Sequence, residues 1–234
     1  MGVASRKASH KARQKQIDLL SKPGYNNLSY NLKLRSYNMM VPMVVEKTSS
    51  SERAYDVFSL ILKERGIFIY GEINDALCSS VVAQLLYLEA QDPTKDINLY
   101  INSQGGSVLS GLTVVNCLKI LKAPVASFVL GQAASMGSII ASAATKGKRY
   151  MLPYSRAMLH QVSSGSQGTY LDMKIALAET ERLNELLTNM YVDFTGQPYE
   201  KLKEDMSRDF FLTPEEAVAY GLADHVMTER MSSI

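Results

Sequence analysis

The sequence has few cysteines and no long apolar run. Only two cysteines occur among 234 residues, Cys78 and Cys117, and both lie in apolar surroundings without CxxC spacing. This pattern argues against a disulfide framework or a zinc site and predicts two buried free thiols in a reducing compartment. No apolar run approaches the roughly 18 residues of a membrane-spanning helix, so no membrane insertion is expected. Neither GxGxxG nor GxxxxGK is present, so neither phosphate-binding fingerprint is indicated.

Charge is distributed unevenly along the chain. Residues 1–45 carry eight Lys and Arg and one acidic residue, a balance of +7, whereas the other 189 residues carry 17 basic and 22 acidic groups, a balance of −5. The arm over residues 1–38 is rich in Ser, Lys and Arg and lacks the apolar core of a secretory signal. We expect a removable transit or pro-segment, with a solvated tail as the alternative. No nucleic-acid partner is expected, because no aromatic or Gly-rich interleaving accompanies the basic residues.

Helical and extended patterns alternate through residues 39–234, which we expect to form one domain. Strands are predicted at "GIFIYGE", "INLYIN" and "PVASFVL", and helices at "NDALCSSVVAQLLYLEAQ" and "SVLSGLTVVNCLKILK". This alternation indicates parallel strands joined by helical crossovers, the α/β class. An earlier amphipathic helix is predicted from apolar residues at i, i+3, i+4, i+7 and i+8: Ala54, Val57, Phe58, Ile61 and Leu62.

The C-terminal part begins with one long helical pattern, "TYLDMKIALAETERLNELLTNMYVDFTG". It predicts a helix of roughly seven turns, which is longer than a crossover needs and therefore suited to meeting another subunit. A shorter helix is predicted at "TPEEA", with Thr213 as N-cap, Pro214 at the first position and Glu216 closing a capping box.

A serine in the stretch "GQAASMGSII" is a candidate nucleophile. Ser135 lies among Gly and Ala residues where an apolar helix begins, so a ligand can approach it closely. Such a serine needs a nearby base. His160 ends the strand-like "RAMLH" and precedes a polar stretch, which suits a base at the edge of a cleft, although a strand-end histidine also bonds to backbone.

The acid that would orient His160 is not fixed by spacing. The candidates that follow it are Asp172, Asp193, Asp205 and Asp209. Asp209 in "SRDFF" is expected to be partly buried before two aromatic residues, where a hydrogen-bonded carboxylate stays ionised; the alternative is a surface pair with Arg208.

Two glycines in "NSQGGS", residues 102–107, end a strand and enter a helix. Their backbone can approach a ligand, and an oxyanion hole needs two such N–H groups. The amide of Met136, directly after Ser135, is the natural second donor.

Four motifs in fixed order, "YINSxGGS", "GQAASMGS", "LPYSRAMLHQ" and "RDFFLTPEEAVAYGLADHV", resemble the proteolytic subunit of Clp protease (ClpP) over about residues 39–231. The resemblance implies a crotonase-like α/β fold, a ββα superhelix with a projecting handle helix. It also implies a serine endopeptidase that degrades unfolded proteins inside two stacked heptameric rings. Ser135 resembles the nucleophile, His160 the base and Asp209 the acid, while Gly106 and Met136 resemble the oxyanion donors; no metal or cofactor is implied.

The same resemblance implies contacts with other subunits. The long helix resembles the handle by which the rings interdigitate, and Asp172 and Arg208 match a pair used across the ring interface. The ATP-dependent partner would be an AAA+ unfoldase of the ClpX, ClpA or ClpC type. Its docking positions would be Leu86, Tyr100, Phe128, Leu130, Tyr150, Leu152 and Met227. Self-processing is expected near Asn38–Met39.

Three residues depart from the family pattern: Gln104, Val162 and Asn98. The first two concern substrate-strand binding, and the third concerns unfoldase docking. One alternative function is a weakly active or structural subunit of a mixed ClpP/ClpR-type ring. Another is a crotonase-fold enzyme acting on acyl-CoA thioesters, for which a Ser/His/Asp set has no role. The basic arm favours an organelle matrix, of a mitochondrion or plastid, over the bacterial cytoplasm.

Overall fold

The computed structural model describes residues 41–47 and 52–228 of the chain. The basic arm over residues 1–38 and the expected processing junction at Asn38–Met39 lie outside these ranges. The chain divides into two units, Met1–Met43 and Val44–Ile234. All elements described below belong to the second unit, except that the first strand begins at Met43.

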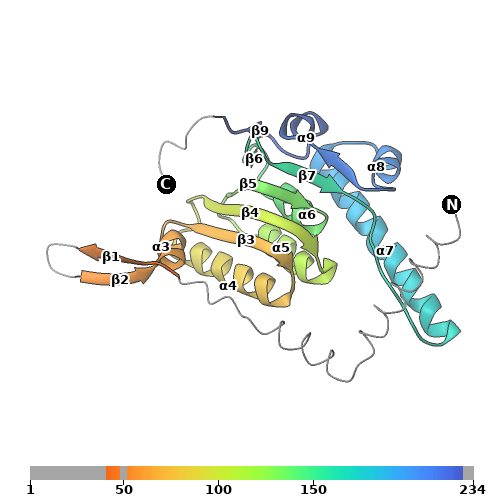
Figure 1. Cartoon of the computed structure of the whole chain (residues 1–234), viewed down its shortest axis with the longest axis horizontal. Coiled ribbons are helices and arrows are strands. Elements are labelled where there is room, and N and C mark those ends of the chain that lie inside the picture. Colours follow the sequence, from red (N-terminus) through yellow and green to blue (C-terminus); the bar gives the residue numbers. More distant parts are fainter. Residues whose placement is uncertain (1–40, 48–51, 229–234) are drawn as a thin grey trace, which may run out of the picture. The chain divides into compact units, whose positions relative to one another are not determined.

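A sheet of seven strands forms the centre of the second unit (Figure 1). The strands are β3 (Gly66–Ile73), β4 (Ile97–Gly106), β5 (Val125–Ala134), β6 (Arg149–Met151), β7 (Arg156–Leu159), β8 (Phe210–Leu212) and β9 (His225–Val226). The main path runs β3-β4-β5-β6-β9, and each pairing along it is parallel. Strand β7 pairs in parallel with β5 and antiparallel with β8. The predicted α/β class is confirmed.

Helices follow the strands as the alternation predicted. They are α3 (Val57–Lys63), α4 (Asp75–Gln91), α5 (Val108–Ile120), α6 (Met136–Ser142), α7 (Tyr170–Thr195), α8 (Tyr199–Asp205) and α9 (Pro214–Tyr220). The predicted start of α9 is confirmed: the Thr213 side chain accepts from the Glu216 N–H, the Glu216 side chain bonds back to the cap, and Pro214 opens the helix. None of the helices in the described ranges has the length and apolarity needed to span a membrane.

The first predicted helix begins later than its apolar spacing indicated. Ala54 lies on strand β2 (Glu52–Asp56), which pairs with β1 (Met43–Lys47), and the helix α3 starts only at Val57. The reason is a local cap, because the Asp56 side chain accepts a hydrogen bond of 2.9 Å from the Ser59 N–H and so fixes the helix start after the strand.

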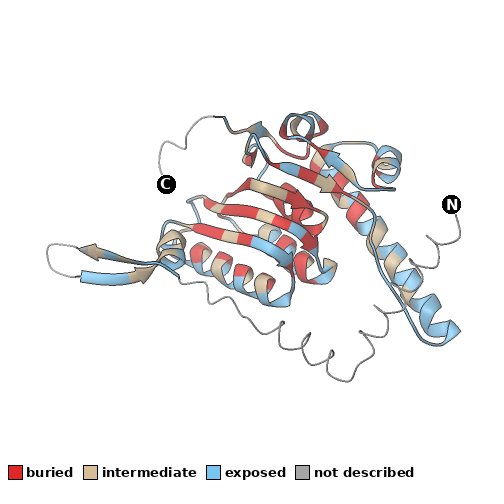
Figure 2. Ribbon diagram, viewed as in Figure 1, coloured by how far each residue is buried: buried red, intermediate tan, exposed pale blue. Residues whose placement is uncertain are grey.

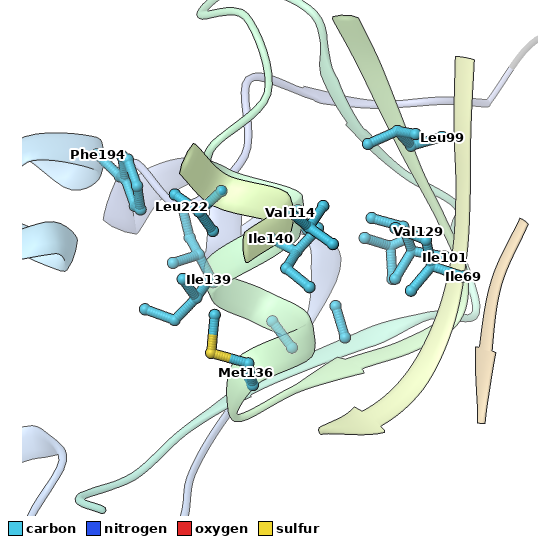
Figure 3. Packing of buried hydrophobic residues seen from close by; sticks show 14 of the residues in the cluster. Ile69, Leu99, Ile101, Val114, Val129, Met136, Ile139, Ile140, Phe194 and Leu222 are labelled. Carbon is cyan, nitrogen blue, oxygen red and sulfur yellow. The ribbon is translucent and has the colours of Figure 1, made fainter. Parts of the chain in front are cut away.

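The two faces of the sheet bury different residues. On β4, Leu99 and Ile101 point into the main core, to which α4, α5 and α6 contribute apolar side chains. Figure 3 shows Val114 of α5 and Ile140 of α6 in this core, whereas Tyr100 belongs to a second cluster on the opposite face. Every residue of α6 is buried, including Ile139 and Ile140 at the centre of the core. This burial holds α6, and with it the preceding residue Ser135, against the core face of the sheet.

The long predicted helix is confirmed as α7, with 26 residues and a capping box between Thr169 and Asp172. Its buried residues, from Leu187 to Phe194, all lie in its C-terminal half. Its N-terminal half extends away from the sheet and is largely exposed (Figure 2). Large apolar side chains remain exposed there: Tyr170, Leu171, Met173, Ile175 and Leu177.

Cys78 and Cys117 are free and buried, as predicted. Burial raises the pKa of both thiols, and nearby carboxylates add to the shift. Both thiols therefore stay protonated at neutral pH and pack as small apolar side chains.

Candidate active site

Ser135 lies at the junction between β5 and α6 in a backbone conformation that L-residues rarely adopt. Its φ is 53° and its ψ is −125°. Such a conformation costs on the order of 1–3 kcal/mol and persists only where surrounding contacts hold it. Here the Ser135 N–H donates to Met158 O at 2.8 Å, and the Ser135 carbonyl accepts from the Ser138 N–H at 2.9 Å. These bonds tie the residue to β7 on one side and to α6 on the other.

His160 directly follows β7 and faces the serine. Its Nε2 atom lies 2.8 Å from Ser135 Oγ, and its side chain is partly exposed. Strand β7 runs beside β5 in parallel, with Ala134 opposite Met158. The two strands therefore end within one residue of each other in the register, which brings Ser135 and His160 close although they are 25 positions apart in the sequence.

Asp209 lies on the other side of His160. The antiparallel pairing of β7 with β8 sets Leu159 opposite Phe210, so the next residue of one strand, His160, meets the preceding residue of the other, Asp209. The Asp209 Oδ1 atom lies 3.1 Å from His160 Nδ1. Among the four acidic candidates, Asp209 is the one with this contact.

The expected partial burial of Asp209 is wrong, because its side chain is 59% exposed. The two aromatic residues that follow it do not cover it: Phe211 is itself exposed and lies under the Arg156 guanidinium, and Phe210 packs against Tyr220. The Arg208 guanidinium donates to the Ser207 carbonyl at 2.7 Å.

A pocket of about 340 Å³ opens beside Ser135 and His160. Its apolar wall includes Val108, Ile139 and Leu187, which suits an uncharged side chain of a ligand. The complete lining is Glu72, Gln104, Gly105, Gly106, Val108, Ser135, Ile139, His160, Gln161, Val162, Ser163, Leu187 and Tyr191.

The glycine pair forms the wall of the pocket nearest to Ser135. A Cβ atom on Gly105 would lie 2.7 Å from Ser135 Cβ, and its φ of +95° also disfavours a side chain. Gly106 has a φ of +151° and packs against the backbone of Ile73 in β3. The family resemblance pointed to Gly106 of this pair, and Gly105 was not predicted, because its contact with Ser135 depends on the tertiary structure.

Met136 follows Ser135 at the first position of α6. Its backbone nitrogen would lie 3.2 Å from a Cβ on Gly105, so the amide is near the glycine pair. Its side chain is buried and packs against Gly111 of α5. The Met136 amide therefore lies beside Gly105, the neighbour of Gly106, and the role of Gly106 and Met136 as oxyanion donors stays a prediction.

Gln104, one of the departures from the family pattern, lies at a β-bulge. The register of β3 against β4 shifts between Tyr70 and Glu72. With its amide nitrogen turned toward Gly71 O and its amide oxygen toward the Glu72 N–H, Gln104 makes two bonds of 3.2 Å that close this bulge. Sequence reasoning did not predict this contact.

The predicted interface pair does not meet within one chain. Asp172 caps α7, where its Oδ2 atom accepts from Thr169 Oγ1 at 2.6 Å. Arg208 lies beside Asp209, where its guanidinium contacts Ser207 O. The pairing across two subunits stays a prediction.

Most of the predicted docking residues gather on the face of the sheet opposite the main core. Tyr100 and Phe128 stack with a centroid distance of 5.5 Å, Phe128 and Tyr150 with one of 5.0 Å, and Leu130 and Met227 pack against them. Leu152 is half-buried. Leu86 lies on α4, 48% exposed. Docking itself stays a prediction.

No three His, Cys, Asp or Glu side chains gather as a metal site within the part of the chain that the structure describes. The arrangement around Ser135 instead combines a hydroxyl, an imidazole and a carboxylate in sequence, next to a small apolar pocket. The family model described as Clp protease matches residues 49–230, which contain all of these groups.

Proposed function

The chain belongs to the Clp protease family, a family of serine peptidases, and we propose that Ser135, His160 and Asp209 are its catalytic triad. The observation that carries this proposal is the continuous contact of 2.8 Å from Ser135 Oγ to His160 Nε2 and of 3.1 Å from His160 Nδ1 to Asp209 Oδ1. A nucleophile, a base and a group that orients the base are the three parts that acyl transfer through serine requires.

In the first half of the reaction, Ser135 Oγ attacks the carbonyl carbon of a peptide bond while His160 Nε2 takes the hydroxyl proton. The carboxylate of Asp209 accepts a hydrogen bond from Nδ1–H, which fixes the tautomer and stabilises the imidazolium. The tetrahedral oxyanion receives hydrogen bonds from the backbone N–H groups of Gly106 and Met136. The C–N bond then breaks, and His160 Nε2–H protonates the departing amine.

The second half of the reaction releases the acyl group. Water attacks the ester carbon, and His160 takes its proton and passes it to Ser135 Oγ as the C–O bond breaks. The products are a carboxylic acid and a free serine, so the cycle requires no metal or cofactor. The apolar pocket wall supports substrates with an apolar residue next to the cleaved bond.

We propose that the natural substrates are unfolded proteins, delivered by an ATP-dependent AAA+ unfoldase into a chamber of two stacked heptameric rings. The exposed apolar residues of α7 support subunit association, because large exposed apolar patches mark interaction surfaces. The partly exposed side chains at the edge of the Phe128 cluster, Leu130, Tyr150 and Met227, support docking of the unfoldase. The Ser-, Lys- and Arg-rich arm supports location in an organelle matrix.

A fluorophosphonate probe tests the proposed nucleophile. We expect covalent labelling of the full-length protein, located on Ser135 by mass spectrometry and abolished in Ser135→Ala. An assembled protein that takes no label would contradict the proposal and favour a structural subunit of a mixed ring. Turnover of acyl-CoA thioesters without labelling would favour the other alternative.

A further inference from the structure

Two buried hydroxyl groups join the backbone of Ser135 to the long helix α7. Ser138, 1% exposed, lies one turn into α6, and its Oγ donates to Ser135 O at 2.7 Å. Tyr191, 2% exposed, reaches this point from α7, and its hydroxyl oxygen lies 2.7 Å from Ser138 Oγ and 3.4 Å from Ser135 O. Neither hydroxyl belongs to the Ser135, His160 and Asp209 contacts.

The two hydroxyl protons can be assigned so that Tyr191 donates to Ser138 and Ser138 donates to the Ser135 carbonyl. Ser138 has a single proton and donates it to Ser135 O, so its oxygen is free to accept from Tyr191. Burial raises the pKa of Tyr191, so its hydroxyl stays protonated and can donate to Ser138. A chain of donation therefore runs from Tyr191 through Ser138 to the carbonyl of Ser135.

The carbonyl that receives these bonds shares a peptide plane with the amide of Met136. In a trans peptide the C=O and N–H groups point in opposite directions, so fixing Ser135 O on one side fixes the Met136 N–H on the other. The conformation of Ser135 is strained, and a strained peptide needs such external contacts to hold one orientation. Ser138 Oγ also lies 3.2 Å from Met158 O, on the strand that leads to His160.

We propose that Tyr191 and Ser138 are positioning residues that aim the Met136 N–H at the oxyanion of the peptidase reaction. This inference rests on the proposed function and deepens it. Tyr191 also lines the pocket beside Ser135, but the two hydroxyls contact each other and the Ser135 carbonyl rather than the reacting atoms, so they act through the Ser135–Met136 peptide. The long helix α7 thus contributes, through Tyr191, to the geometry around the nucleophile Ser135.

The test compares Tyr191→Phe and Ser138→Ala with Tyr220→Phe in the full-length protein. Tyr220 is a matched control, because it is also buried and its hydroxyl donates to the Asp205 carboxylate at 2.6 Å rather than to Ser138 or the Ser135 carbonyl. We measure Tm, kcat and KM for a short fluorogenic peptide, and the affinity for a peptide aldehyde, which forms a tetrahedral adduct with the serine. Tm separates a loss of stability from a loss of catalysis.

We expect Tyr191→Phe and Ser138→Ala each to lower kcat about tenfold, with KM changed less than about twofold. The affinity for the aldehyde falls by a similar factor, because an adduct with an oxyanion loses the same alignment. The double variant falls no further than Ser138→Ala alone, since both groups belong to one chain of bonds. Tyr220→Phe retains kcat and aldehyde affinity within about twofold of wild type at a comparable change in Tm.

Folded Tyr191→Phe and Ser138→Ala variants with wild-type kcat and aldehyde affinity would overturn the inference and leave the proposed function intact. Equal losses in Tyr220→Phe would also overturn it, because they would reduce the effect to general stability. If Tyr191→Phe does not fold, Ser138→Ala decides the outcome alone. A wild-type protein without peptidase activity would overturn both the proposed function and this inference.

Discussion

Gly105 packs directly against Ser135. A Cβ atom on Gly105 would lie 2.7 Å from Ser135 Cβ and 2.8 Å from Ala134 O, distances at which one of the two residues must move. The close approach brings the backbone of the glycine pair beside the nucleophile. It explains why a residue without a side chain is required at this position.

Gly105→Ala is therefore expected to displace Ser135 and to lower kcat/KM at least about 100-fold, the loss that misplacement by about 1 Å produces. Gly196→Ala is the matched control, since Gly196 also has a positive φ, +76°, but its added Cβ meets nothing within 4 Å. Peptide hydrolysis by both variants, with Tm measured alongside, checks this prediction. Equal activity of the two variants would show that the contact with Ser135 is unimportant.

A second prediction concerns the buried ion pair between Arg149 and Asp224. The Arg149 Nη2 atom lies 2.6 Å from Asp224 Oδ1, and Nη1 donates to Phe194 O at the end of α7. Burial raises the pKa of Asp224, but hydrogen bonds to Arg149 and its positive charge outweigh burial, so the net pKa lies below the ordinary value of 3.8. Ionised Asp224 therefore stabilises the fold above that value, and this contribution is lost as the pH falls through the lowered pKa.

Asp224→Asn is expected to lower the free energy of unfolding at neutral pH by about 3–5 kcal/mol, because it leaves the buried Arg149 charge without its partner. Asp96→Asn is the control, since Asp96 pairs with Lys148 at the surface and such pairs contribute at most about 1 kcal/mol. Urea denaturation of the three proteins measures both values. An Asp224→Asn protein as stable as Asp96→Asn would contradict this account.

The predicted docking residues separate into buried and exposed groups, and their variants are expected to behave differently. Phe128 is 5% exposed and stacks between Tyr100 and Tyr150, so Phe128→Ala is expected to cost about 3–5 kcal/mol of stability. Leu86 is 48% exposed on α4, so Leu86→Ala is expected to change stability by less than about 0.5 kcal/mol.

The effect of these variants on unfoldase docking is measured as the rate at which a folded protein is degraded in the presence of the unfoldase and ATP. Leu86→Ala is expected to slow this degradation without loss of stability. If Leu86→Ala degrades the folded protein at the wild-type rate, the residue has no part in docking and the prediction for it fails.

Local features of the chain were predictable from the sequence. The capping box at Thr213, the long helix of α7 and the strand before His160 follow from hydrogen-bonding chemistry and periodicity that involve residues close in sequence. The start of α3 was misplaced because apolar spacing continues across the preceding strand β2, which pairs with β1 and ends at the Asp56 cap.

Contacts between segments far apart in the sequence were harder to predict. The hydroxyl of Tyr191 lies 53 positions from Ser138, and neither residue differs from ordinary helical core in the sequence. The exposure of Asp209 depends on the direction in which Phe210 and Phe211 turn, which the β7–β8 pairing decides. Spacing brings candidate groups into consideration, whereas tertiary packing decides which ones meet.

The most direct test of the central claim is hydrolysis of a short fluorogenic peptide by the assembled full-length protein, with Ser135→Ala beside the wild type. Short peptides enter a closed chamber without an unfoldase, so the identity of the partner does not affect the result. The account predicts cleavage by the wild type and a loss of at least about 1,000-fold in Ser135→Ala. Absence of cleavage by the assembled wild type, or equal cleavage by the variant, would contradict it.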